Sequence, residues 1–240
     1  MADDLPDFLA TREPSAQRPL LGLTVLVVED SRFACEAMRL LCLRSGARIR
    51  RADCLASARR HLMSYRPTVV IVDLGLPDGS GLDLIREIAG RSPRVPALLG
   101  TSGDSGAEAA TLAAGADGFL AKPIESLSAF QTAVLAALPA TPRPISAGSG
   151  ETEDRVAPDL LALRDDLAHA ADMLGHRPAG EDLDYLAQFL AGVARSAHDA
   201  PLQAAAEALA RDRLAGRGTG TPVSRISGLV RDRLASGTAF

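Results

Sequence analysis

Five polar residues in the first half of the chain follow short apolar runs, each at the point where a run ends. They are Glu29 and Asp30 after residues 23–28, Asp73 at the end of residues 68–73, Thr101 at the end of residues 97–101, and Lys122 after residues 117–121. In a parallel sheet the carboxyl ends of the strands lie along one edge, where ligands bind. If the apolar runs are parallel strands, we expect these side chains to converge there.

This set of side chains suits phosphoryl transfer. Three carboxylates at one edge repel each other and need a cation, and hard oxygen ligands with room for water favour Mg²⁺. One oxygen of Asp73 can hold the metal while the other attacks phosphorus, and Thr101 and Lys122 can take the remaining charge. Each residue taken alone could instead cap a helix or lie in a turn, but their joint placement favours the phosphoryl-transfer interpretation.

Lys122 is also the only lysine among the 26 lysines and arginines of the chain. The abundance of arginine suggests that Arg is used wherever a generic cation suffices. Arg is a wide planar fork, whereas Lys is a slim point charge. The single lysine therefore suggests a position where Arg does not fit.

The surrounding pattern predicts an α/β fold. Short apolar runs alternate with amphipathic stretches from residue 23 onward, which indicates βα units and a parallel five-stranded sheet. Strands are expected at residues 23–28, 47–52, 68–73, 97–101 and 117–121, and helices at residues 31–45, 55–65, 82–89, 105–114 and 126–138. These elements form a domain over residues 20–138.

The rest of the chain has a different character. Residues 1–19 contain three prolines and mixed charge and are interpreted as a flexible leader. Residues 139–158, rich in Pro, Ser, Gly and acids, are interpreted as a linker. The remainder, residues 159–240, is expected to be an all-α domain, with helices at residues 159–174, 181–197, 201–214 and 222–235 in an antiparallel bundle.

The composition limits the classes of function. Hydrophobic residues make up 47% and charged residues 23%, a soluble globular balance, and no apolar run is long enough to span a bilayer. The first 19 residues lack the apolar core of a signal peptide, so we expect a cytoplasmic protein. The net charge of −4 and the absence of Trp argue against nucleic-acid binding. Three cysteines without a Cys-x-x-Cys pair are interpreted as core thiols.

Residues 23–138 resemble the receiver domain of bacterial two-component response regulators. The resemblance rests on residues 27–30 (VVED), 69–83 (VVIVDLGLPDGSGLD), 99–102 (LGTS), 115–119 (GADGF) and 121–123 (AKP). It implies a flavodoxin-like (βα)₅ fold, Mg²⁺ as cofactor, and a histidine kinase or histidine phosphotransfer protein as phosphodonor. It also implies a signalling protein that turns over only its own phosphoryl group, rather than an enzyme acting on other substrates.

The resemblance further assigns roles residue by residue. It implies that Asp73 is the phosphoacceptor, Glu29 and Asp30 the acidic metal pair, the Gly75 backbone carbonyl the third metal ligand, Thr101 the switch hydroxyl, Lys122 the phosphate-binding lysine and Phe119 the switch aromatic. Phe119 lacks the hydroxyl or imidazole nitrogen of many family members, so its movement would depend on packing alone. Gly75 and Gly103 leave bare two positions that, in the family, tune the access of water to the acyl phosphate.

The helical tail is less informative. Residues 188–194, continuing to Leu209, weakly resemble the central helices of histidine phosphotransfer domains, with Gln188 at the position of the phosphorylated histidine and Ala191 at that of the usual lysine. Gln cannot accept phosphate as His does. The tail is therefore either a degenerate phosphotransfer bundle used for docking or dimerisation, or an unrelated bundle; in both cases we expect a downstream protein partner.

A second interpretation of the tail is a transcription factor. Residues 201–214 and 222–235, joined by a Gly-rich turn, could form a helix-turn-helix with Arg225, Arg231 and Arg233 facing DNA. Asp212 and Asp232 interleave with these arginines, and the acidic excess of the chain lies in its tail. The sequence therefore favours a protein-interaction output over a DNA-binding one.

Overall fold

The computed structural model describes residues 13–104, 106–139 and 154–236. Within this part of the chain the five long strands form one parallel sheet in the order β2-β1-β3-β6-β7. They are β1 (Thr24–Val28), β2 (Arg48–Ala52), β3 (Val69–Asp73), β6 (Ala97–Ser102) and β7 (Gly118–Ala121). The predicted α/β fold of the first domain is confirmed.

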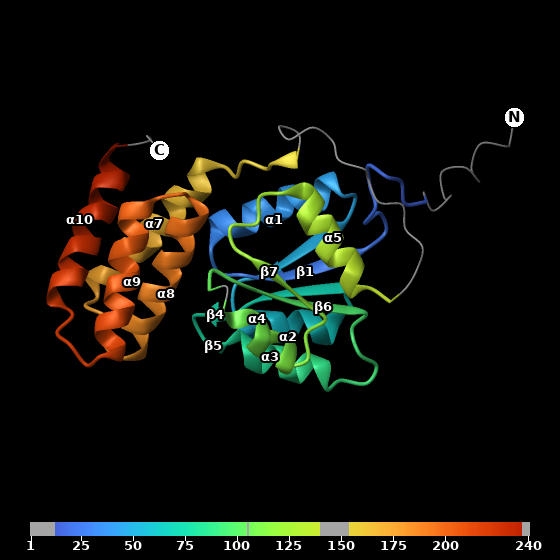
Figure 1. The fold of residues 1–240 in the computed structure, drawn as a ribbon, viewed down its shortest axis with the longest axis horizontal. Helices are drawn as coiled ribbons and strands as arrows, with labels where there is room; N and C mark the ends of the chain where they lie inside the picture. The colour runs from blue at the N-terminus through green and yellow to red at the C-terminus, as the bar shows by residue number, and fades with distance from the viewer. Residues whose placement is uncertain (1–12, 105, 140–153, 237–240) are drawn as a thin grey trace, which may run out of the picture.

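Helices cover both faces of the sheet (Figure 1). One face carries α1 (Arg32–Arg44) and α5 (Leu127–Ala137), and the other carries α2 (Leu55–Ser64), α3 (Gly81–Ala89) and α4 (Ala107–Ala113). Alternate strand residues face opposite sides. In β3, Val69 and Ile71 belong to the core under α1 and α5, whereas Val70 and Val72 belong to the core under α2 and α3. Burial on both faces explains why these strands are continuous apolar runs.

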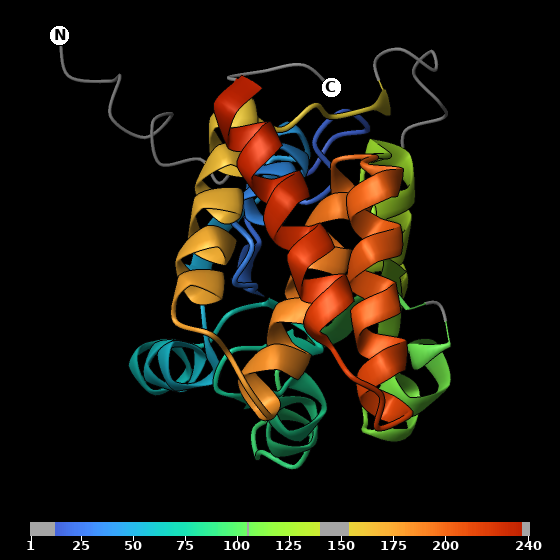
Figure 2. The same cartoon turned by 90° about the vertical axis from the view of Figure 1, so that its left-hand side faces the viewer.

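The predicted helical domain is also present. Residues 160–236 form a bundle of four helices, α7 (Leu160–Gly175), α8 (Glu181–Ser196), α9 (Ala200–Leu214) and α10 (Gly220–Ser236). Its core includes Leu186, Leu190, Leu209 and Ile226, all fully buried. In Figure 2 the bundle lies nearest the viewer, in front of the α/β domain. None of the helices in the described ranges has the length and apolarity to cross a membrane.

Two segments differ from the sequence-based expectation. A short antiparallel hairpin of β4 (Gly75–Leu76) and β5 (Gly79–Ser80), which was not predicted, lies between β3 and α3. The last residues of the predicted 139–158 linker pack onto the first domain: the Val156 side chain is 7% exposed, and its backbone N–H donates to Glu125 O. An apolar side chain that fills the core accounts for this, so Val156 packs with the first domain although it lies within the predicted linker.

The leader also ends earlier than expected. Residues 1–12 lie outside the described part of the chain, but residues 15–18 form a turn in which Arg18 N–H donates to Ser15 O at 3.0 Å. The next residues join the core, since Leu20 is fully buried and its N–H donates to Ser45 O at 2.9 Å. Pro19 is buried as well, so the core of the domain begins one residue before the predicted boundary at residue 20.

Candidate metal centre and the helix that covers it

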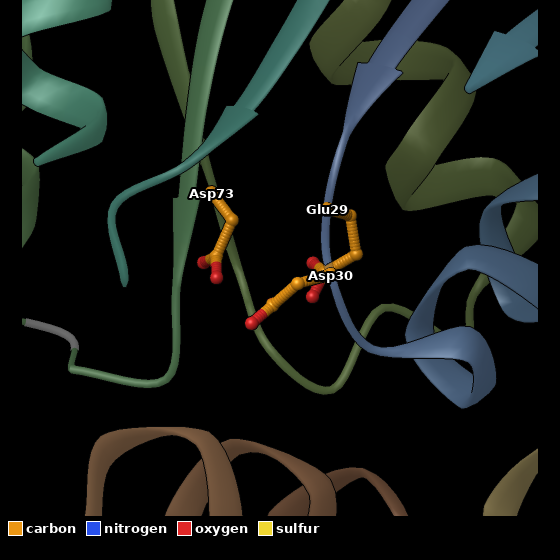
Figure 3. Close-up of side chains that lie close together, drawn as sticks. All are labelled: Glu29, Asp30 and Asp73. Atoms are coloured by element: carbon orange, nitrogen blue, oxygen red, sulfur yellow. The ribbon is translucent and has the colours of Figure 1, made fainter. Parts of the chain in front are cut away.

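Three carboxylates meet at the carboxyl edge of the sheet. Glu29 and Asp30 follow β1, Asp73 ends the adjacent β3, and one oxygen of each lies within 4.8 Å of the others. Figure 3 shows the side chains converging from the two strands. Glu29 is 2% and Asp73 8% exposed. The chain can return past Asp73 only because residue 81 is glycine, since a Cβ there would collide with the Asp73 carbonyl.

Lys122 supplies a positive charge at this cluster. Its Nζ lies 2.6 Å from Glu29 Oε2 and 3.1 Å from Asp73 Oδ1, and its side chain is 6% exposed. The backbone holds the residue in place, because Lys122 N–H donates to Ser102 O at 2.9 Å at the end of β6. The single lysine of the chain thus bridges two of the three predicted acidic ligands.

Burial makes the charged forms of the acids costly. It raises the pKa of Glu29 to about 7 and that of Asp73 to about 7, in spite of the nearby ammonium. It also raises the pKa of Asp30 to about 6, although the hydrogen bond from Tyr185 lowers it. Burial would lower the pKa of Lys122, but the charges of Asp73 and Glu29 raise it overall. One ammonium therefore neutralises only part of the negative charge of three carboxylates. A site with oxygen ligands only and an excess of negative charge fits a hard divalent cation.

Not every predicted site residue lies at the cluster. The Thr101 hydroxyl donates to Leu120 O at 2.7 Å and is fully buried, so it is held against β7. Phe119 is half-buried in β7, and neither side chain lines the cavity beside the carboxylates. Gly75 and the neighbouring Ser102 do line it. The three carboxylates, Lys122 and Gly75 thus line one cavity, whereas the two predicted switch residues do not reach it.

The helical bundle closes over this edge of the sheet. Helices α7 and α8 contact α1, and α8 also contacts β4. A cavity of about 470 Å³ remains between the domains, with Asp73 and Lys122 on one side and Gln188, Gly192 and Arg195 of α8 on the other. A wider cavity of about 870 Å³ on the other side of Asp30 keeps the acids accessible from a second direction.

Direct polar contacts join the bundle to the site. The Tyr185 hydroxyl of α8 donates to Asp30 Oδ2 at 2.5 Å. Asp166 of α7 accepts from three groups at the N-terminus of α1: Ser31 Oγ at 2.7 Å, Arg32 N–H at 2.8 Å and Phe33 N–H at 3.0 Å. A carboxylate at a helix N-terminus satisfies free N–H groups and the positive end of the dipole. The bundle therefore caps the helix that follows the acidic pair.

Sequence reasoning did not identify these contacts. Tyr185, Asp166 and Arg195 carry no motif, and Tyr185 lies 155 residues from its partner Asp30. The weak phosphotransfer resemblance did single out Gln188, whose amide packs directly against Gly75. In the structure α8 packs against the acidic edge of the sheet in its own chain, and the predicted role in docking a partner or in dimerisation stays a prediction.

Comparisons with known proteins concern the first domain. Residues 25–134 match the family described as response regulator receiver domain. The KDP operon transcriptional regulatory protein KdpE of Escherichia coli (strain K12) is 33% identical over 99 residues, which covers 41% of this chain and 44% of that protein. The probable transcriptional regulatory protein TcrX of Mycobacterium tuberculosis (strain ATCC 25618 / H37Rv) is 37% identical over 102 residues, covering 42% and 44%.

Among solved structures, a response regulator from Chloroflexus aurantiacus J-10-fl has 30% identity and a TM-score of 0.41, covering 43% of this chain and 87% of that one. The chain spans about half the length of the curated relatives it matches. The family match ends before the bundle begins at Leu160. With its parallel sheet and strand-end acids, the segment 25–134 of this chain is therefore a response regulator receiver domain of a two-component system.

Proposed function

We propose that the protein accepts a phosphoryl group on Asp73 from the phosphohistidine of a histidine kinase or phosphotransfer protein, and signals to a protein partner through its bundle. The observation that carries this proposal is the placement of Asp73 Oδ1 at 3.1 Å from Lys122 Nζ within a cluster of three carboxylates. A nucleophilic carboxylate beside a fixed cation is the arrangement that phosphoryl transfer requires. The protein turns over only its own phosphoryl group, in the cytoplasm.

The donor set supports Mg²⁺ as the cofactor. Glu29, Asp30 and Asp73, whose oxygens lie within 4.8 Å of one another, would hold the ion together with the backbone carbonyl of Gly75, because Mg²⁺ prefers hard oxygen ligands. When bound, the ion supplies positive charge to the phosphoryl oxygens.

Four side chains of the receiver domain have separate roles in the phosphoryl transfer and the response to it. Asp73 attacks phosphorus with a carboxylate oxygen, and the Lys122 ammonium neutralises charge on the transferred group. The Thr101 hydroxyl reaches that group only by leaving its present acceptor, Leu120 O. Phe119, in the same strand as Leu120, then repacks into the space that Thr101 leaves. This pairing of two movements gives the domain two alternative packings, which the charge on Asp73 biases.

The contacts of the bundle support a protein-interaction output. Because Tyr185 bonds Asp30 directly, a change in charge at the site acts on α8 without an intermediate. The same bundle argues against the helix-turn-helix alternative. Arg233, one of the three expected DNA contacts, donates to Asp199 at 2.7 and 3.0 Å and so is committed within the bundle. Arg225 and Arg231 are exposed on α10.

DNA binding as the output is favoured by the names of the relatives, which are transcriptional regulatory proteins. An electrophoretic mobility shift at low salt, with and without phosphorylation, distinguishes the two outputs. We expect no retardation of any duplex in either state. A salt-sensitive shift that weakens in Arg225→Ala would instead favour DNA binding.

The phosphoacceptor proposal is tested by incubating the full chain with acetyl phosphate and Mg²⁺ and measuring intact mass. We expect a gain of one phosphoryl group that is lost at alkaline pH. Asp73→Asn should abolish the gain, whereas Asp83→Asn, on the exposed face of α3, should retain it. Absence of the gain in the wild-type chain, or its persistence in Asp73→Asn, contradicts the proposal. A pull-down with and without beryllofluoride then identifies the partner.

A further inference from the structure

Two glycines of the receiver domain are covered by side chains of α8. Gly75 follows the phosphoacceptor in β4, and Gly103 follows β6. A Cβ at Gly75 would collide with the amide of Gln188, and a Cβ at Gly103 would collide with the guanidinium of Arg195. The space that a side chain of the receiver would fill at each position is thus taken by a polar group of the bundle.

The two covering side chains share one face of α8. Gln188 and Arg195 are seven residues apart, which is about two helical turns. Between them lie the small residues Ala191 and Gly192, and among the described residues no atom outside the adjoining residues and the helix's own backbone lies within 4 Å of a Cβ built at Gly192. The helix therefore presents an amide and a guanidinium on either side of an open space that faces the phosphoacceptor.

That space has the size and the walls that a phosphoryl group requires. The cavity measures about 470 Å³, and Asp73 and Lys122 line its opposite wall. Since a water molecule takes about 30 Å³ of liquid volume, a phosphoryl group and several waters fit there. Phosphorylation is thus compatible with a docked bundle, and a phosphoryl group on Asp73 would face α8.

The guanidinium is held in position by its own domain. Arg195 Nη2 donates to Glu207 Oε1 of α9 at 3.1 Å, and Gln203 Nε2 donates to the same oxygen at 2.8 Å. The Arg195 side chain is 25% exposed, so it lies between the helices rather than in open water. An arginine anchored in this way contributes charge at a fixed place with little loss of side-chain entropy.

We propose that α8 is a built-in dephosphorylating element: Gln188 orients the water that hydrolyses the acyl phosphate on Asp73, and Arg195 neutralises the charge of the reacting group. This inference rests on the proposed function, because it requires a phosphoryl group on Asp73. A carboxamide can accept a hydrogen bond from water and donate one to a phosphoryl oxygen. In GTP hydrolysis a glutamine orients the attacking water and an arginine stabilises the charge of the transition state.

The step balances without any further reactant. The oxygen of water forms a bond to phosphorus while the bond between phosphorus and the Asp73 oxygen breaks. The electron pair of that bond returns to Asp73 as a carboxylate, and the protons of the water leave with inorganic phosphate and solvent. Asp73 is regenerated, and the chain is ready for another cycle.

The experiment measures the lifetime of the phosphoryl group on the full chain. The protein is phosphorylated with acetyl phosphate and Mg²⁺, freed of donor by desalting, and followed by intact mass. Gln188→Met keeps the length of the side chain but removes the amide, and Arg195→Met removes the guanidinium. We expect each to lengthen the half-life by about tenfold or more. Arg164→Met, on an exposed position of α7, is the matched control and should leave it unchanged.

The sign of the effect separates this proposal from simple shielding. If Gln188 and Arg195 only kept water away, their replacement would shorten the half-life, and a shorter or unchanged half-life in both variants overturns the proposal. Gly103→Ala gives a second test without altering α8, because its Cβ displaces only the far end of Arg195, and the same change made in the Arg195→Met background corrects for a direct effect of the new Cβ on water. It should also lengthen the half-life, though by less.

Failure of the proposed function looks different. If the wild-type chain gains no phosphoryl group, the assignment of Asp73 fails and the half-lives have no meaning. If it gains one, hydrolysis in ¹⁸O-labelled water should place a single ¹⁸O atom in the released phosphate and none in the protein. Label in the protein would indicate attack at the carboxyl carbon and would contradict the role of Gln188.

Discussion

At the scale of single residues, Lys122 has the most closely defined environment. Its ammonium fits between Glu29 and Asp73 with 6% of the side chain exposed. Lys122→Arg keeps the charge but adds a broad planar group, so it should displace one of the two carboxylates. We expect the initial rate of phosphorylation by acetyl phosphate, measured by intact mass, to fall by at least about tenfold.

The reverse exchange provides the control for this prediction. Arg225→Lys alters an exposed cation on α10, where geometry imposes no constraint, and should leave the rate at its wild-type value. A wild-type rate in Lys122→Arg would mean that charge alone matters at this position. The scarcity of lysine in the chain would then be a matter of composition.

At the scale of elements, the N-terminus of α1 depends on a residue of another domain. Asp166 is 2% exposed and accepts hydrogen bonds from Ser31, Arg32 and Phe33. Asp166→Ala removes the carboxylate that accepts from these three groups and leaves the buried donors without a hydrogen-bond partner there. We expect a loss of about 2–3 kcal/mol in the free energy of unfolding, measured by urea denaturation followed by circular dichroism.

The neighbouring residue serves as the comparison. Asp165 pairs with Arg32 on the surface, where the two side chains are 44% and 65% exposed. Asp165→Ala should therefore cost less than about 0.5 kcal/mol. Equal losses in the two variants would show that Asp166 is no more than another surface charge, and that the bundle is not anchored through it.

At the scale of the whole molecule, the two domains share apolar contacts. Phe33 belongs to the receiver domain, yet it lies in the buried core of the bundle and is 5% exposed. A side chain common to both domains couples their unfolding, so we expect a single cooperative transition by calorimetry. Phe33→Ala removes the shared contact, at a cost of about 3 kcal/mol, and should separate the transition into two.

Met63→Ala is the control for this coupling. Met63 is 76% exposed on α2, so its truncation should leave one transition near the wild-type temperature. Two transitions in the wild-type chain would contradict the coupling outright. A single unshifted transition in Phe33→Ala would locate the coupling elsewhere in the interface.

The sequence by itself determined the five long strands, the helices of both domains and the identity of the charged residues at the sheet edge, but not the short hairpin of β4 and β5. Buried parallel strands are apolar on both faces, and helices carry local start signals such as Ser31 and Ser126, whose side chains accept from backbone N–H groups in the first turn. These signals are short-range, so they are visible in a linear chain. The position of Glu29 and Asp73 at strand ends follows from the same pattern.

Only the tertiary structure decided where the bundle lies. The contacts that dock it join residues as far apart as Asp30 and Tyr185, 155 positions distant, and none of them repeats with a helical or strand period. The burial of Val156 in the receiver core likewise depends on a surface assembled from distant segments. Periodicity records which face of an element is apolar, whereas docking depends on a few polar groups and small residues whose match exists only once both surfaces have formed.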